Sequence, residues 1–162
     1  MTIRRLTLAD APEFRTLRLR ALHDHPADFG SDHASEAAKP LSHFITQLAD
    51  NHVMGAFLDG TLAGIIALEF KTKPKEAHRA FLWGVYVAPQ ARGRGVAAPL
   101  LDAAIAVAIA RATQVELGVR AGNTPAEALY RSRGFTEYGR EPNTYIVDGA
   151  PCDSLLMVRH RA

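Results

Sequence analysis

Apolar and polar side chains alternate along the first part of the chain in patterns that predict a strand followed by a helix. Residues 3–6 alternate with a period of two, which is typical of a short strand. Helical spacing follows, in the apolar positions Phe14, Leu17, Ala21 and Leu22. Asp10 is a good N-cap, Pro12 suits the first turn, and Glu13 stands where a capping box places its acid. We therefore expect this helix to begin directly after Asp10.

The pattern then changes to a long polar stretch, a second helix and a hairpin. Residues 24–40 lack regular spacing and contain prolines and glycine, so they are predicted to form the longest loop. A second short helix is indicated by the apolar residues Leu41, Phe44, Ile45 and Leu48. Residues 53–58 and 62–70 form a predicted hairpin around Asp59-Gly60, a pair that tolerates the positive φ angles of a tight turn.

The second half of the chain continues with strands and helices in alternation. Strands are predicted at residues 79–87 and 114–119, with two later ones at about 144–147 and 154–158. The helix between the first two strands ends near Arg111 and has one apolar side, formed by Leu101, Ile105, Ala108 and Ile109. The last helix is bounded by the N-cap Thr124, then Pro125, Glu127 and, past its end, Gly134. The order β-α-α-β-β-β-α-β-α-β-β predicts an α/β fold, a mixed sheet flanked by helices.

Composition narrows the class of protein. A chain of 162 residues with 48% hydrophobic content has the size of one domain, which we expect to span residues 1–162. The net charge of +2 is too small to suggest a nucleic-acid partner. The N-terminus does not read as a secretory signal, and the apolar segment 96–110 is too short to cross a bilayer, so we expect a soluble, cytoplasmic protein without a membrane partner. Cys152 is the single cysteine and the histidines lack ligand spacing, so no metal site is expected.

The chemistry of the chain is concentrated in the segment from Val85 to Ala98. A buried strand here runs into a loop with Gly93 and Gly95 that opens a helix. The first amides of a helix are unsatisfied donors at the positive end of its dipole, and glycines let a backbone approach a ligand closely. Together they predict an anion site that suits phosphate, to which Arg92 and Arg94 add positive charge.

This segment resembles the acetyl-CoA loop of the GNAT acyltransferase superfamily, whose pattern Gln/Arg-x-x-Gly-x-Gly/Ala is met by Gln90, Gly93 and Gly95. The resemblance extends downstream, where Asn123, Leu129-Tyr130 and Gly134-Phe135 stand as the Asn, Leu-Tyr and Gly-Phe of that family stand. It covers nearly the whole chain. It implies a mostly antiparallel central sheet and an N-acetyltransferase that moves an acetyl group from acetyl-CoA to a primary amine.

The resemblance also implies roles for individual residues. The main chain at Val85 and Val87, with Tyr86 between them, would pair with the pantetheine arm of the coenzyme. The pyrophosphate would be held by amides of the loop and helix start, at Arg92, Gly93, Arg94, Gly95, Val96 and Ala97. Asn123 would contact the pantetheine or order the nearby loop, and the catalytic residue Tyr130 would protonate or hydrogen-bond the departing thiolate through its hydroxyl. The N–H of Val87 would polarise the thioester carbonyl.

Plainer roles compete with some of these. Tyr130 could pack its ring in the core with its hydroxyl at the surface, and Asn123 could be a loop residue before the Thr124 cap. Trp83 and Phe29 are expected in the core rather than in contact with substrate.

Two departures from the family pattern bear on the chemistry. Pro99 removes one amide from the opening turns of the coenzyme helix, a modest loss because early helix amides largely lack internal partners. The strand 79–87 carries no Asp or Glu, although some family members place a general base there. Glu69, Tyr86, His78 or a water chain could take the proton of the amine, and the residues do not choose among them.

The acceptor amine is left open between a small molecule, a peptide and a protein, and so is the choice between a monomer and a homodimer. Two other functions compete. A non-catalytic acyl-CoA sensor would use the same loop without turnover. An NAD-dependent enzyme is suggested by Gly93 to Ala98, which fits G-x-G-x-x-A with Glu116 beyond it. Against NAD, the intervening residues 89–92 separate strand from glycine, and too few residues follow to complete a doubly wound sheet.

Overall fold

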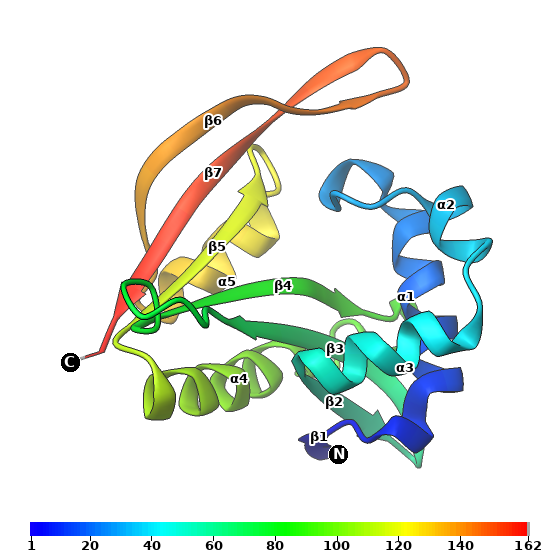
Figure 1. Ribbon diagram of the computed structural model, residues 1–162. Coiled ribbons are helices and arrows are strands. Elements are labelled where there is room, and N and C mark those ends of the chain that lie inside the picture. Colours follow the sequence, from blue (N-terminus) through cyan, green and yellow to red (C-terminus); the bar gives the residue numbers. More distant parts are fainter. Residues whose placement is uncertain (162) are drawn as a thin grey trace.

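Seven strands form one sheet in the computed structural model, which describes residues 1–161 (Figure 1). The strands are β1 (Thr2–Arg5), β2 (His52–Leu58), β3 (Thr61–Phe70), β4 (Arg79–Val87), β5 (Gln114–Arg120), β6 (Thr136–Val147) and β7 (Ala150–His160). The helices are α1 (Ala11–Asp24), α2 (His33–Ala37), α3 (Leu41–Asp50), α4 (Ala97–Arg111) and α5 (Thr124–Ser132). The strand order across the sheet is β1-β2-β3-β4-β5-β7-β6. Among the residues described, no helix is long and apolar enough to cross a membrane.

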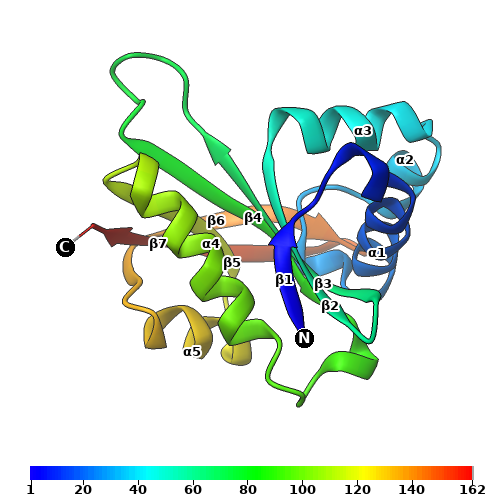
Figure 2. The same cartoon turned by 90° about the horizontal axis from the view of Figure 1, so that it is seen from below.

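The sheet is buried on both faces where β3 crosses its middle. Ile65 and Ala67 of β3 point into one hydrophobic core with α1 and α3, whereas Ile66 and Leu68 point into a second core with α4. Alternate side chains of a strand face opposite sides, so a strand between two helical layers is apolar at nearly every position. Figure 2 shows the result, with α4 and α5 on one side of the sheet and α1 to α3 on the other.

One pair of strands breaks the otherwise antiparallel pattern and separates along its length. β4 and β5 are parallel and pair through three residues, Arg79 to Phe81 of β4 with Gln114 to Glu116 of β5. Beyond Phe81 the two strands splay apart into a V, visible between the green and yellow strands of Figure 1. Within this stretch the register against β3 shifts around Gly84, which has a φ of +63°. This β-bulge bends β4 just beyond the point where its pairing with β5 ends.

The predicted fold class is confirmed, and several predicted boundaries agree with the structure. The hairpin of β2 and β3 turns at Asp59 and Gly60, with φ angles of +50° and +80°. The loop expected at residues 24–40 instead contains the five-residue helix α2, capped by Asp32, whose side chain accepts a hydrogen bond from the amide of Ser35. A helix this short has too few positions to show a helical period, so its sequence resembles that of a loop.

The last two strands are much longer than the predicted segments 144–147 and 154–158. β6 has no buried residue along its length, so it lacks the alternation that marks a strand. Its regularity comes from pairing with β7, and the β6–β7 hairpin extends beyond the rest of the sheet in Figure 1.

The ends of two helices differ in detail from the prediction. The carboxylate of Asp10 does not cap α1 but turns back, accepting from the amide of Thr7 at 2.6 Å and from Arg4 at 2.8 Å. The N-cap of α5 is Asn123 rather than Thr124, since the Asn123 side chain accepts from the amide of Ala126 at 3.4 Å. Asn is as good a cap as Thr, so the sequence permitted both starts.

Candidate active site

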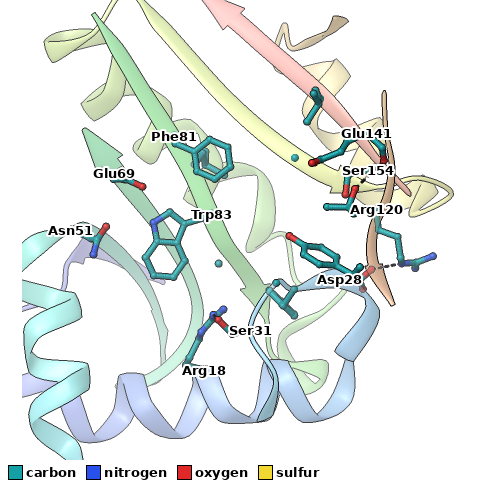
Figure 3. A pocket seen from close by; sticks show the side chains of 18 of the residues that line it. Arg18, Asp28, Ser31, Asn51, Glu69, Phe81, Trp83, Arg120, Glu141 and Ser154 are labelled. Carbon is teal, nitrogen blue, oxygen red and sulfur yellow. Dashed lines mark hydrogen bonds and ion pairs between the residues drawn. The ribbon is translucent and has the colours of Figure 1, made fainter. Parts of the chain in front are cut away.

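Two cavities meet at the bulge of β4. The first, which we call the α4 cavity, has a volume of about 520 Å³ and follows β4 toward the start of α4. The second, the α1 cavity, has a volume of about 540 Å³ and lies above α1 (Figure 3). Their walls share residues from both arms of the V and from the segment after α1, namely Leu82, Trp83, Gly84, Gly118, Arg120, Asp28 and Phe29. A molecule in one cavity can therefore touch a molecule in the other at Gly84.

The open edge of β4 forms one wall of the α4 cavity. Ala88 donates its amide hydrogen to Ala63 of β3 at 2.8 Å. Successive amides of a strand point to opposite edges, so the N–H of Val87 faces away from β3 into the V. The carbonyl of Val87 on this edge accepts a hydrogen bond from Arg92 Nε at 3.1 Å. The edge thus presents main-chain donors and acceptors to an extended ligand.

The loop between β4 and α4 has the conformation that glycine permits. Gly93 and Gly95 have φ angles of +72° and +71°, values that other residues rarely adopt. A Cβ on either glycine would meet no atom within 4 Å, so the constraint is on the backbone rather than on packing. The first hydrogen bond of α4 runs from Leu100 N to Val96 O, so the amides of Ala97 and Ala98 precede it. Pro99 stands where no such bond is lost.

The predicted coenzyme residues divide between the cavity wall and the loop beyond it. Seven line the α4 cavity: Val85, Tyr86, Val87, Arg92, Ala97, Asn123 and Tyr130. Gly93, Arg94 and Gly95 are exposed in the adjoining loop, where Arg94 lies 3.6 Å from Asp59. Val96 differs, because its side chain is buried in the core beside Gly64. Only its main chain can therefore serve a ligand.

Tyr130 of α5 lines the α4 cavity. Its side chain is 6% exposed and packs edge-on against Phe135, with ring centroids 5.9 Å apart. Within residues 1–161 its hydroxyl takes part in none of the hydrogen bonds, although it lines the cavity. Burial raises the pKa of this phenol above its ordinary value, so it stays protonated at neutral pH. Core packing and a hydroxyl available as a donor are thus combined in one residue.

The α1 cavity is lined by acidic and aromatic side chains. Figure 3 shows Glu69 and Trp83 on one side and Glu141 on the other. Glu69 lies 2.8 Å from Lys71, which is outside the cavity wall. At the junction of the cavities, Arg120 of β5 pairs with Asp28 at 2.6 Å, so this ion pair links the end of β5 to the turn Pro26–Asp28 that follows α1.

The structure separates the candidate general bases. Glu69 faces the α1 cavity, where an acceptor amine would enter. The hydroxyl of Tyr86 donates to Asp24 at 3.3 Å, and burial raises its pKa, which makes it harder to deprotonate. His78 lines neither cavity; its carbonyl accepts from Thr113 at the far end of the sheet. The geometry therefore leaves Glu69 or a water molecule.

Some residues that line the cavities were not predicted as site residues from the sequence. Arg18 and Glu36 are 4% exposed and lie together at the floor of the α1 cavity, although each stands in an ordinary amphipathic or polar stretch. Trp83 and Phe29 were expected in the core, but both are half-buried and line the two cavities. A charged residue at an apolar position of α1 was the one available hint of Arg18.

Comparison with known proteins agrees with this geometry. A sequence model of the Acetyltransferase (GNAT) family matches residues 18–135. The chain belongs to the GNAT acetyltransferase family. It is 36% identical to the N-alpha-acetyltransferase RimI of Mycobacterium tuberculosis over 115 residues, which cover 68% of this chain and 70% of that protein.

Solved structures of GNAT proteins share the whole fold. A ribosomal-protein-alanine N-acetyltransferase from Brucella melitensis matches with a TM-score of 0.86 and 27% identity, covering 99% of this chain and 100% of its own. The putative acetyltransferase yncA of Salmonella typhimurium, solved with its cofactor acetyl-CoA, matches with a TM-score of 0.81 and 22% identity, over 99% and 93% of the two chains. This GNAT protein is an acetyl-CoA-dependent N-acetyltransferase. The NAD hypothesis is wrong, because β4 and β5 form the single parallel pair among the described strands and no doubly wound sheet exists.

Proposed function

We propose that this GNAT enzyme acetylates the α-amine at the N-terminus of a peptide or protein. The observation that carries the proposal is the junction of the two cavities at Gly84, where a donor and an acceptor can meet. RimI of Mycobacterium tuberculosis is described as an N-alpha-acetyltransferase, and the Brucella protein as a ribosomal-protein-alanine N-acetyltransferase. An N-terminal amine is the acceptor that both descriptions have in common.

The α4 cavity fits the coenzyme in its shape and its polar groups. The open edge of β4 at Val85 and Val87 would pair with the amides of the pantetheine arm, as one strand pairs with another. The left-handed glycines, with nothing in front of them, leave room for the pyrophosphate beside the first amides of α4. Bound acetyl-CoA supplies an activated thioester that an amine can attack.

The chain's own groups would support the transfer on both sides of the bond that breaks. The N–H of Val87 faces the V and would donate to the acyl oxygen as negative charge develops there. The protonated hydroxyl of Tyr130 would donate to the sulfur as the thiol leaves. Glu69, directly or through water, would take the proton that the amine loses.

The acceptor side favours an amine on a flexible, uncharged or basic chain. Arg18 pairs with Glu36, Arg120 with Asp28 and Glu69 with Lys71, which leaves the carboxylate of Glu141 as the excess charge of the cavity wall. A negative wall attracts a protonated amine and disfavours an acidic acceptor. The V is open between its arms, so the rest of a peptide can extend into solvent.

The test is an acceptor panel assayed by release of coenzyme thiol and by mass spectrometry of the product. One peptide carries a free N-terminus and no lysine; its partner has the same sequence with a blocked N-terminus and one added lysine. The first peptide is expected to gain one acetyl group and the second none. Acetylation of the blocked peptide alone, or of small amines and neither peptide, would contradict the proposal.

A further inference from the structure

A buried ion pair forms the floor of the α1 cavity. Arg18 Nη2 of α1 lies 3.5 Å from Glu36 Oε1 of α2 and 3.2 Å from the Ser31 hydroxyl. The side chains of Arg18 and Glu36 are each 5% exposed. Removing two charges from water is costly, and a buried pair seldom repays that cost through stability alone. The pair is therefore expected to take part in binding a ligand.

Hydrogen-bonding capacity remains unused in this pair. Among residues 1–161, Arg18 Nε and Glu36 Oε2 are fully buried without a partner, and so is the amide oxygen of Gln47 in the same wall. Arg18 Nη1 also makes no hydrogen bond to the described chain, but it is not shut off from the cavity. Figure 3 shows the Arg18 side chain rising from α1 toward Trp83. A guanidinium with a free nitrogen in a cavity is a donor prepared for an acceptor group.

The free nitrogen lies at the place where the two cavities meet. Arg18 Nη1 is 3.7 Å from the point that a Cβ on Gly84 would occupy, so the missing side chain at the bulge leaves Nη1 uncovered. The guanidinium packs near two rings and donates to Ser31, with its carbon 5.5 Å from the centroid of Phe29 and 5.4 Å from that of Trp83. Its plane and direction are therefore set before any substrate arrives.

We propose that Arg18 is a specificity-determining residue, whose Nη1 donates a hydrogen bond to the carbonyl oxygen adjacent to the acceptor amine. This inference rests on the proposed function, the acetylation of an N-terminal α-amine. In such an acceptor the amine nitrogen and the first carbonyl oxygen are about 3 Å apart, which follows from ordinary bond lengths. An amine at the cavity junction thus brings its own carbonyl oxygen within reach of Arg18. A lysine side chain has no carbonyl at that distance from its amine.

The charges of the floor select a neutral carbonyl over a carboxylate. Glu36 already compensates the charge of Arg18, so the pair as a whole has none to offer a second anion. Glu141 in the same wall would repel a carboxylate. A peptide bond carries the required oxygen without a charge. The site therefore fits a peptide or an amino-acid amide better than a free amino acid.

The experiment compares two small acceptors of similar shape, alaninamide and isopropylamine, which differ in the presence of the carboxamide. Arg18→Lys keeps the positive charge but loses the planar fork. We expect it to raise KM for alaninamide about tenfold, the usual effect of losing a hydrogen bond to a charged group, with a smaller change in kcat. KM for isopropylamine should stay within about twofold of wild type. Comparing each acceptor with itself across variants cancels the difference in amine basicity.

Arg15→Lys is the matched control. Arg15 stands one turn earlier on α1, binds the Ala37 carbonyl at 3.1 Å and lies 5.6 Å from the ring centroid of Phe44, but lines neither cavity. The Arg15→Lys substitution should leave the ratio of the KM for alaninamide to the KM for isopropylamine unchanged. If Arg18→Lys does not fold, Ser31→Ala removes one group that orients the guanidinium and should produce a smaller loss, again confined to alaninamide.

The outcomes separate the two proposals. Equal losses for both acceptors in Arg18→Lys, or no loss for either, would overturn the role of Arg18 while leaving N-terminal acetylation intact. A wild-type enzyme that acetylates isopropylamine but neither alaninamide nor a free N-terminal peptide would overturn both. A wild type that uses a free amino acid better than its amide would contradict the selection of a neutral carbonyl.

Discussion

The two cavities that meet at β4 are built in different ways. The α4 cavity offers main-chain groups: the edge of β4, two glycines in left-handed conformations and the first amides of α4. The α1 cavity offers side chains from distant elements, among them Arg18 of α1, Glu36 of α2 and Glu69 of β3. The coenzyme is the same for every reaction, whereas acceptors differ.

This difference indicates which positions of each cavity are sensitive to substitution. Main-chain groups depend on backbone conformation, so a site made of them tolerates many side chains but few losses of glycine. A site made of side chains changes its ligand whenever one of them changes. The α4 cavity should therefore be sensitive at its glycines, and the α1 cavity at each of its charges.

The largest effect is expected at Tyr130, where the α4 cavity relies on a side chain. Tyr130→Phe keeps the ring against Phe135 and removes the hydroxyl, so kcat should fall about a hundredfold while coenzyme affinity is nearly unchanged. Since burial raises the pKa of this phenol, the loss of kcat in Tyr130→Phe should be constant across roughly pH 7 to 9. Steady-state kinetics and calorimetry would measure it, with Tyr138→Phe on the exposed face as control. Unchanged turnover would leave Tyr130 a packing residue alone.

Ligand stabilisation tests the α4 cavity as a whole. Acetyl-CoA at about a hundred times its Kd should add about 2.7 kcal/mol to the free energy of unfolding, which for a chain of this size raises Tm by about 5 to 10 °C. NAD should not raise Tm, because the sheet lacks the dinucleotide topology. Thermal melts with each ligand decide this. A response to NAD and none to acetyl-CoA would mean that the cavity is assigned to the wrong molecule.

A substitution in the glycine loop separates backbone from packing. Gly95→Val forces a β-branched residue to a φ of +71° and should weaken coenzyme binding about tenfold, because the loop must leave the conformation that admits phosphate. Gly149→Val is the matched control, since Gly149 has a φ of +76°, equally open surroundings and a place in the turn between β6 and β7. Calorimetry on both folded variants should find a loss in the first alone. Equal coenzyme affinity in Gly95→Val would remove the pyrophosphate from this loop.

The smallest effect is expected at the ion pair that both cavities share. Asp28→Asn weakens the contact between the turn after α1 and Arg120 of β5, and a partly exposed pair is worth about 1 kcal/mol or less. Coenzyme Kd and acceptor KM should both rise by about two- to fivefold, and less at high salt. A change confined to one of the two constants would show that Asp28 belongs to that cavity alone.

The sequence predicted the parts of the fold that depend on local patterns. β4 was bounded correctly at Arg79 and Val87, and β3 within one residue, because both carry long apolar runs bounded by turns. Helix α2 and the full lengths of β6 and β7 were missed, since α2 is too short to show a period and β6 buries no side chain. The regularity of β6 and β7 comes from their pairing with each other.

The same distinction, between features set by local sequence and features set by contacts between distant segments, applies to the site. The sequence by itself determined the side proposed to bind the coenzyme, because positive φ angles at Gly93 and Gly95 and the amides that open α4 are properties of one contiguous segment. The tertiary structure alone decided the side proposed to bind the acceptor. Arg18 and Glu36 stand eighteen positions apart in segments with no common pattern, and the packing of α1 and α2 beneath the bulge of β4 brings them together. A contact between distant segments is set by the whole core, and no single segment records it.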